Sequence, residues 1–282
     1  MNSKSPLKKP LCIYHADCSD GFGAAWAVWS HFAGKVELIP AVHQEEIPDF
    51  TGRDLIIVDF SYKRERMLEI VRQANSVLLI DHHKTAQAEL EDLMESGEIK
   101  GVIDLDKSGS MLCWQWFHPG VEPPRLIRHI QDMDLWRFEM EGTREVLAAL
   151  SSYPFEMELW NQFMSSDLGE LYAEGKAIYR AQMKQIAELI KTATLRQVIA
   201  GYEVPVLNAP GFYASEAGNL LAEGEAFAVI YQDTPSGRKF SLRSKATGVD
   251  VSKVAVRFGG GGHKHAAGFA LAFEELGRLA KG

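Results

Sequence analysis

The sequence has few cysteines and no long apolar run. Its three cysteines, Cys12, Cys18 and Cys113, are odd in number and lack CxxC spacing, which argues against a disulfide framework and a zinc knuckle. The first apolar run, Leu11 to Tyr14, is short, whereas a signal peptide needs about 7–15 apolar residues and a membrane span about 18. Because no stretch reaches either length, we expect a cytoplasmic protein that does not bind membranes.

The sequence also lacks a surplus of positive charge. The formal net charge is −8 and the isoelectric point is about 5.6, which argues against binding to long duplex nucleic acid, since such binding needs a basic face. A basic pocket for a small anion stays compatible with this composition. The length of 282 residues, 46% of them hydrophobic, favours two domains, each with enough apolar material for a core.

The first half of the chain alternates short apolar runs with longer amphipathic ones. Strands are expected at Leu11–Tyr14, Val36–Ala41, Leu55–Asp59 and Val77–Asp81, and helices at Gly23–Phe32, Lys63–Ala74 and Lys84–Glu95. This alternation predicts an α/β fold with a mainly parallel sheet and helices on both faces. Ligands bind such sheets at the carboxyl ends of the strands.

The second half predicts a connector and a smaller α/β domain. Apolar residues at helical spacing indicate one long helix over Glu170–Lys191. Strands are then expected at Val198–Ala209, Ala226–Gln232, Lys239–Arg243 and Phe269–Phe273, and helices at Ser215–Ala222 and Asp250–Phe258, with Ser215 and Asp250 as N-caps. We therefore predict a domain over 1–165, a helical connector over 166–195 and a second domain over 196–282.

Aspartates and histidines follow several of the predicted strands. The candidates are His15, Asp17, Asp20, Asp59, Asp81, His82, His83, Asp132 and Asp134. A single aspartate after a strand is most often a helix cap or turn residue. Parallel strands, however, bring their carboxyl ends to one edge, and several unpaired carboxylates gathered there destabilise a fold. Divalent cations supply the counter-charge, and mixed aspartate and histidine ligation suits Mn²⁺ or a similar ion.

The run Gly259–Gly262, followed by His263 and His265, is the second unusual feature. Four successive glycines do not sit stably inside a helix or strand. A flexible linker is one interpretation. The other is a loop whose backbone N–H groups approach an anion, as in a phosphate nest.

These motifs together resemble the DHH-family phosphoesterases that carry a C-terminal DHHA1 domain. Asp81-His82-His83 matches the DHH signature, and Gly259 to His263 with Ala266-Ala267-Gly268 matches the DHHA1 signature. His15 to Gly21 resembles the first family motif, Asp59 the second, and Asp132 with Asp134 the fourth. Asp17 and Asp20 are three residues apart, where the family commonly has a spacing of two, and Asp20 is the closer match. For the fourth motif Asp132 is preferred, with Asp134 as the alternative.

The resemblance implies a two-domain enzyme with its active site in a cleft. It implies a site for two Mn²⁺ ions, with Mg²⁺ or Co²⁺ as substitutes. The implied metal ligands are His15, Asp17, Asp20, Asp59, Asp81, His82 and Asp132. His82 and His83 are the implied catalytic residues, and the implied substrate-binding residues are Arg243, Gly260, Gly261, Gly262, His263 and His265. A surface ion pair is the alternative role for Arg243.

The expected activity is hydrolysis of short oligonucleotides or linear dinucleotides to mononucleotides by an exonuclease-like phosphodiesterase. A phosphoanhydride hydrolase acting on pyrophosphate-like substrates is the alternative within enzymes, and a non-catalytic nucleotide-binding module is the alternative outside them. A homodimer is also compatible with the sequence.

Overall fold

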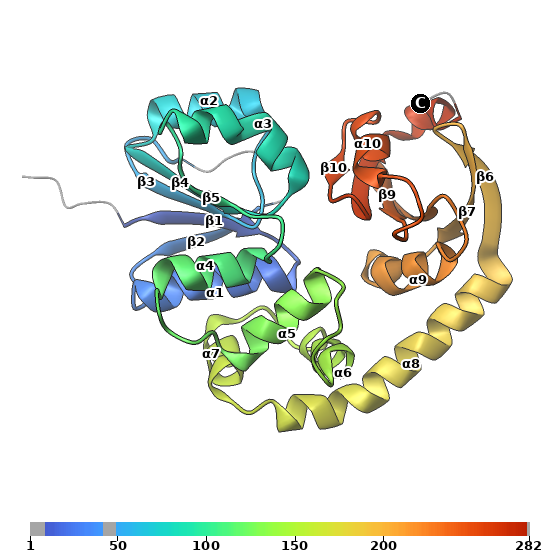
Figure 1. The fold of residues 1–282 in the computed structure, drawn as a ribbon, viewed down its shortest axis with the longest axis horizontal. Helices are drawn as coiled ribbons and strands as arrows, with labels where there is room; N and C mark the ends of the chain where they lie inside the picture. The colour runs from blue at the N-terminus through green and yellow to red at the C-terminus, as the bar shows by residue number, and fades with distance from the viewer. Residues whose placement is uncertain (1–8, 42–48, 281–282) are drawn as a thin grey trace, which may run out of the picture. The chain divides into compact units, whose positions relative to one another are not determined.

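The computed structural model describes residues 9–41 and 49–280 (Figure 1). The chain packs as two compact units, Met1–Tyr179 and Arg180–Gly282, and the division falls inside helix α8 (Gly169–Ala193). Within the described residues, no helix combines the length and the apolar character needed to cross a bilayer.

The first unit contains a five-stranded sheet in which all strand pairs are parallel, in the order β2-β1-β3-β4-β5. Its strands are β1 (Leu11–His15), β2 (Glu37–Ala41), β3 (Asp54–Val58), β4 (Ser76–Asp81) and β5 (Lys100–Ile103). All five carboxyl ends therefore lie at one edge of the sheet. The sequence predicted a mainly parallel sheet and four of these strands, but not β5.

Helices cover both faces of this sheet. The helices of the first unit are α1 (Ser19–His31), α2 (Arg64–Gln73), α3 (Lys84–Glu95), α4 (Gly109–Phe117), α5 (Arg125–Asp134), α6 (Thr143–Leu150) and α7 (Met157–Ser165). Helices α5, α6 and α7 pack against α1, α4 and one another (Figure 1). Helices α2 and α3 lie on one face, and α1 and α4 on the other (Figure 1). Leu55 and Ile57 of β3 pack into the core under α2 and α3, and Ile56 and Val58 pack into the core under α1 and α4. A strand buried on both faces has no polar alternation, which explains its continuous apolar run.

The second unit contains a mixed six-stranded sheet in the order β10-β11-β9-β8-β7-β6, in which β7 and β8 are parallel and the other pairs antiparallel. Its elements are β6 (Thr194–Ile199), β7 (Tyr202–Asn208), the 3₁₀ turn η1 (Gly211–Tyr213), α9 (Ala214–Leu221), β8 (Ala228–Thr234), β9 (Gly237–Arg243), α10 (Val251–Val256), β10 (Gly261–Gly262), β11 (Ala266–Leu271) and η2 (Phe273–Arg278). The two sheets and their helices confirm the α/β fold class.

Three local expectations for this unit were wrong. The strand expected over Val198–Ala209 is interrupted, because Ala200 (φ 52°) and Gly201 (φ 85°) form a left-handed turn that folds β6 back on β7. The last strand ends at Leu271, so Phe273 begins a 3₁₀ turn instead. Tyr213, not Ser215, occupies the N-cap of α9. Asp250 does cap α10, because its carboxylate accepts a hydrogen bond from the Ser252 N–H at 3.1 Å.

Candidate active site

The carboxyl edge of the parallel sheet gathers most of the expected aspartates and histidines. His15 ends β1, Asp59 directly follows β3, and Asp81 ends β4. Asp20 lies in the first turn of α1, and His82 lies in the short link between β4 and α3. Asp20, Asp59, Asp81 and His82 are each at most 2% exposed. Buried charged groups need partners, so their contacts decide what the site can bind.

His82 lies among three carboxylates. Its Nε2 atom is 3.1 Å from Asp59 Oδ1, 3.6 Å from Asp20 Oδ2 and 3.6 Å from Asp134 Oδ2. Burial lowers the pKa of His82, but the hydrogen bond to Asp59 and the surrounding negative charges outweigh it and raise the pKa to about 10. The carboxylates therefore attract a positive charge to this point.

Asp59 adopts a left-handed backbone conformation, with φ 62°. Its second carboxylate oxygen, Oδ2, is 3.4 Å from His15 Nδ1. Burial raises the pKa of Asp59, but the interactions with His15 and His82 prevail and hold that pKa well below its usual value. Asp59 thus stays ionised between two imidazoles, at a backbone position that few residue types tolerate.

Asp81 uses its two oxygens differently. Its Oδ1 atom accepts hydrogen bonds from the backbone N–H groups of His82 (2.7 Å) and His83 (3.3 Å) and lies 2.7 Å from His83 Nδ1. Its Oδ2 atom is buried and has no hydrogen-bond partner among residues 9–41 and 49–280. A buried carboxylate oxygen without a partner is costly. This atom is oriented and available to bind a cation.

Asp20 faces the N-terminus of α4, a contact that the sequence analysis missed. Its carboxylate accepts hydrogen bonds from Gly109 N–H (2.6 Å), Ser110 N–H (3.0 Å) and Ser110 Oγ (2.5 Å). A Cβ atom at Gly109 would lie only 2.6 Å from Asp59 Oδ1. The available signal was Ser108-Gly109-Ser110 before an apolar helix, with Ser108 as its N-cap. Spacing alone did not connect that segment with Asp20, which is 89 residues away.

Burial and the charges of Asp59 and Asp134, in that order, raise the pKa of Asp20 well above its usual value, although His82 and Ser110 act in the opposite direction. Several carboxylates at one point compete for the same positive charge. The N–H donors of α4, however, suit an ionised Asp20. A bound cation would resolve this conflict.

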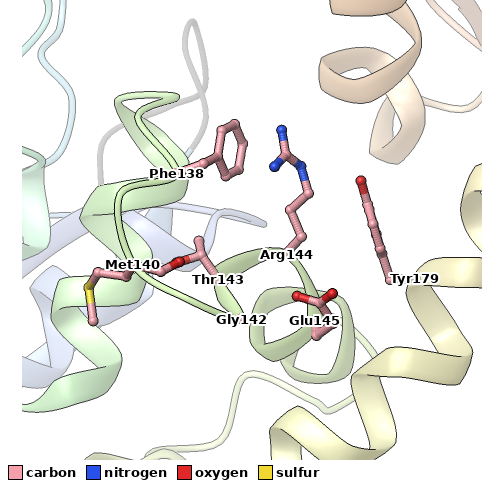
Figure 2. A pocket seen from close by; sticks show the side chains of 7 residues that line it. All are labelled: Phe138, Met140, Gly142, Thr143, Arg144, Glu145 and Tyr179. Carbon is pink, nitrogen blue, oxygen red and sulfur yellow. The ribbon is translucent and has the colours of Figure 1, made fainter.

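The structure places Asp134, and not the preferred Asp132, with the other site carboxylates. Asp132 accepts hydrogen bonds from Glu139 N–H (2.8 Å), Met140 N–H (3.2 Å) and Thr143 Oγ1 (2.5 Å), so it holds the loop that follows α5. Asp134 ends α5 beside His82. The loop after Asp134 also lines a pocket of the first unit (Figure 2).

Asp17 and Cys18 take different positions. Asp17 has φ 52°, is exposed, and lines a small hollow with Tyr14 and Phe22. In the described part of the chain it belongs to no group of side chains that could share a metal ion. Cys18 lies near His15 and Asp59, but burial, together with the nearby carboxylates, raises the pKa of its thiol well above the usual value. A protonated thiol is a weak ligand.

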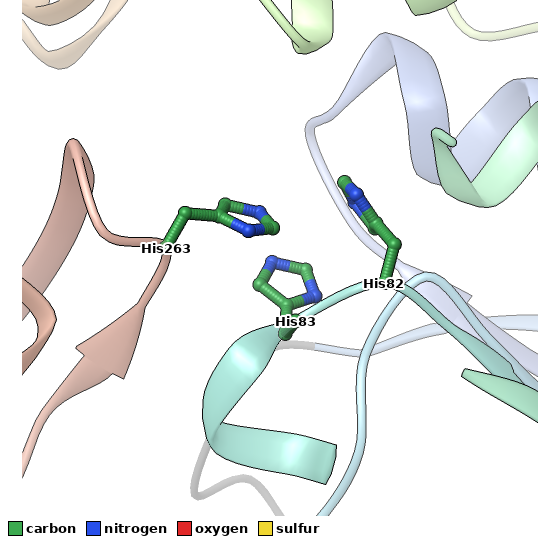
Figure 3. Close-up of side chains that lie close together, drawn as sticks. All are labelled: His82, His83 and His263. Atoms are coloured by element: carbon green, nitrogen blue, oxygen red, sulfur yellow. The ribbon is translucent and has the colours of Figure 1, made fainter. Parts of the chain in front are cut away.

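Among the described residues of the first unit, three groups of donor atoms are close enough to share an ion: Asp20, His82 and Asp134; Asp59, Asp81 and His83; and His15, Cys18 and Asp59. Figure 3 shows His82 and His83 side by side at the end of β4, and their ring centroids are 4.7 Å apart. Mixed oxygen and imidazole donors suit first-row divalent ions. Together with Asp81 Oδ2, which has no hydrogen-bond partner among the residues that the structure describes, these donor sets fit bound divalent metal.

The second unit holds the expected substrate-binding residues. The Arg243 Nη2 group donates to Ser215 Oγ of α9 at 3.0 Å. Gly218 of α9 leaves room for Arg243, because a Cβ atom there would lie 2.7 Å from Arg243 Cγ. His265 Nδ1 lies 3.0 Å from Ser244 Oγ, which donates to Val249 O. The sequence analysis did not predict these contacts of Ser215 and Gly218 with Arg243.

The glycine run differs from the expected open loop. The N–H groups of Gly259, Gly260 and His263 donate to Val256 O, Ala255 O and Ala266 O. Gly261 and Gly262 form the short strand β10, paired with β11. The glycines permit this close packing, since a Cβ atom at Gly260 would lie 2.0 Å from Gly268 O. Those three donors are therefore used within the unit and do not form an open anion nest.

Known proteins support the family suggested by the motifs. No family model matches the chain. The chain is 32% identical to the uncharacterized protein R106 of Acanthamoeba polyphaga mimivirus over 93% of its own length and 67% of that protein. It is 26% identical to the oligoribonuclease NrnB of Bacillus subtilis over 78% of its own length and 60% of that protein. The chain belongs to the DHH family of phosphoesterases.

The chain also resembles solved structures. It matches the pGpG-specific phosphodiesterase PggH of Vibrio cholerae at 14% identity and a TM-score of 0.49, covering 97% of each chain. It matches RecJ of Thermus thermophilus, solved with Mn²⁺, at 15% identity and a TM-score of 0.43, covering 95% of this chain and 50% of that one.

Proposed function

We propose that this protein is a divalent-metal-dependent phosphodiesterase that hydrolyses short oligonucleotides or linear dinucleotides to mononucleotides. The observation that carries the proposal is the buried set of Asp20, Asp59 and Asp81 around His82, in which Asp81 Oδ2 has no partner in the described part of the chain. The relative named oligoribonuclease NrnB supports a short nucleic acid substrate. The net charge of −8 fits a short substrate better than a long polymer.

Two Mn²⁺ ions are the proposed metals, with Mg²⁺ or Co²⁺ as substitutes. The residues proposed to hold them are His15, Asp20, Asp59, Asp81, His82 and Asp134, because these lie in the groups with converging donor atoms. When bound, such ions supply Lewis acidity and counter-charge for phosphoryl oxygens.

His83 is the proposed contact to the substrate phosphate. Its side chain is 19% exposed, whereas that of His82 is 2% exposed. Asp81 Oδ1 lies 2.7 Å from His83 Nδ1, and an ionised carboxylate only accepts, so Nδ1 carries the proton. We propose that the Nε2 atom of His83 donates to the transferring phosphate when the ring is an imidazolium, and accepts a proton when the ring is neutral. His82 Nε2 lies at the carboxylates of Asp20 and Asp59, and His82 is proposed to hold metal together with them.

In the second unit, Arg243 is proposed to bind another phosphate of the substrate. A guanidinium binds phosphate through two parallel hydrogen bonds, and Ser215 and Gly218 fix its position. His263 and His265 are proposed as additional donors. The roles of Gly260, Gly261 and Gly262 are proposed to be steric, because they allow β10 to pack closely against β11.

The test is product analysis with dinucleotides, longer oligonucleotides, cyclic dinucleotides and pyrophosphate, with Mn²⁺ and after chelation. We expect chelation to abolish hydrolysis, and Mn²⁺ to restore it better than Ca²⁺, which prefers looser all-oxygen sites. Asp59→Asn should lose activity by orders of magnitude, and the matched variant of the exposed Asp106, Asp106→Asn, should retain it. Faster cleavage of pyrophosphate than of any diester would establish a phosphoanhydride hydrolase. Nucleotide binding without turnover would establish a binding module.

A homodimer and a cytoplasmic location are also proposed. Light scattering of the purified protein measures the first, and cell fractionation measures the second.

A further inference from the structure

The loop after α5 and the start of α6 form a pocket of about 280 Å³ in the first unit. It is lined by Phe138, Met140, Gly142, Thr143, Arg144, Glu145 and Tyr179. The Arg144 guanidinium lies 3.4 Å from the centroid of the Phe138 ring. Figure 2 shows the Tyr179 ring on the other side of Arg144. A pocket walled by a planar cation and an aromatic ring has the shape and chemistry to hold a flat ring.

The same loop connects this pocket to the candidate metal centre. Phe138 follows Asp134 by four residues, so their Cα atoms are at most about 14 Å apart. Asp132 holds the loop through the N–H groups of Glu139 and Met140 and through Thr143 Oγ1. Trp136 (φ 57°) and Phe138 (φ 55°) are left-handed, a costly backbone that persists where its surroundings fix it. The pocket is therefore a fixed feature close to the site of the proposed chemistry.

Glu145 supplies a carboxylate that allows this pocket to distinguish between flat rings by their hydrogen-bonding groups. It is half-buried and lies in the first turn of α6, where the helix dipole favours a negative charge. Its carboxylate makes no hydrogen bond or ion pair with another residue in the part of the chain that the structure describes. Two acceptor oxygens next to a flat slot match a ring that presents two adjacent N–H donors.

We propose that this pocket binds one base of the nucleotide substrate and prefers guanine, an inference that rests on the proposed phosphodiesterase function. Guanine presents N1–H and the N2 amino group side by side, so it pairs with a carboxylate through two hydrogen bonds. Adenine and cytosine each present one donor beside an acceptor, and uracil presents one donor between two acceptors. A volume of about 280 Å³ is at the lower end for small-molecule sites and fits one base, not a whole dinucleotide.

The decisive test is whether replacing Glu145 changes the preference of the protein for guanine over adenine. A glutamine amide offers one acceptor and one donor, so it can pair with N1 and the N6 amino group of adenine but no longer accepts from both guanine donors. We expect the wild-type protein to bind GMP about 10- to 100-fold more tightly than AMP, since a good bidentate pair discriminates by that amount. Glu145→Gln should lose this preference and bind AMP more tightly than the wild type does. Glu141→Gln, at an exposed glutamate outside the pocket, is the matched control and should behave as wild type.

Isothermal titration calorimetry of the Mn²⁺-loaded protein with GMP and AMP measures these affinities without turnover. Hydrolysis of pGpG and pApA gives the corresponding ratio of kcat/KM. Equal affinity of the wild type for GMP and AMP, or a guanine preference that survives in Glu145→Gln, would overturn the proposal. Equal displacement of both nucleotides by inorganic phosphate, with no effect of Glu145, would show a simple anion site and also overturn it. A Glu145-dependent GMP preference without hydrolysis of any diester would instead retain the base pocket and refute the proposed activity.

Discussion

Replacing Gly109 with alanine tests how closely α4 and the site carboxylates are packed. The new Cβ atom would lie 2.6 Å from Asp59 Oδ1, 2.8 Å from Asp59 Cβ and 3.0 Å from Asp20 Oδ2. Ordinary contact begins at 3.4 Å, so the α4 N-terminus or Asp59 has to move by about 0.8 Å. The Gly109 N–H also donates to Asp20 at 2.6 Å, and that hydrogen bond weakens when the helix moves away.

Two effects follow from this displacement. Overpacking of a buried site costs about 1–3 kcal/mol, and about 2 kcal/mol lowers Tm by about 4–8 °C in a protein of this size range. Loss of an oriented hydrogen bond to a metal-binding carboxylate reduces metal affinity about 10- to 100-fold. We therefore expect Gly109→Ala to unfold at a lower temperature and to bind Mn²⁺ more weakly, with a parallel loss of hydrolysis.

Thermal unfolding in EDTA isolates the packing cost, and Mn²⁺ titration calorimetry measures the affinity. Gly277→Ala is the matched control, because a Cβ atom at Gly277 meets nothing within 4 Å and the residue is not left-handed. Wild-type stability together with wild-type Mn²⁺ affinity in Gly109→Ala would refute the close packing of α4 on Asp20 and Asp59.

Three further predictions concern individual side chains. Asp81→Asn keeps an acceptor for the His82 N–H but removes the charge, so we expect a folded protein that loses Mn²⁺ binding and most of its hydrolysis, as followed by circular dichroism and calorimetry. Burial, with the charge of Arg125, lowers the pKa of His129 to about 4, so between pH 6.5 and 4 the unfolded chain binds more protons. The free energy of unfolding should therefore decrease, by at most about 3 kcal/mol, as the pH is lowered through this range. Urea unfolding of His129→Gln should show a smaller decrease than that of the wild type. Gly218→Ala displaces Arg243 and should raise KM for dinucleotides several-fold, with little effect on a chromogenic phosphodiester; equal losses on both substrates would contradict the assigned role.

The sequence predicted those parts of the site that depend on local pattern. The apolar runs before Asp59 and Asp81 form buried parallel strands, and parallel strands bring these aspartates to one edge. Asp81-His82-His83 could be matched to the DHH signature from the sequence because its three residues are adjacent. Hydrophobic burial on both faces of the sheet imposes such patterns directly on the sequence.

The remaining features depend on contacts between distant segments. The spacing of Asp132 and Asp134 does not show which carboxylate accepts hydrogen bonds from the following loop. In the structure, the loop N–H groups donate to Asp132. The contact between Gly109 and Asp20 joins positions 89 residues apart. The Ala200–Gly201 turn was missed because an alanine at positive φ is rare.

Because Asp59 has a left-handed backbone, a replacement that preserves its charge and a replacement that preserves its shape have different consequences. Glutamate preserves the charge, yet it is poorly suited to positive φ and its longer side chain would have to fit beside Gly109. Asparagine discards the charge, yet it tolerates this backbone and matches the shape of aspartate. Sequence drift at this position is therefore constrained twice, by the conformation of the main chain and by the charge that the site needs. Aspartate is the residue that meets both demands.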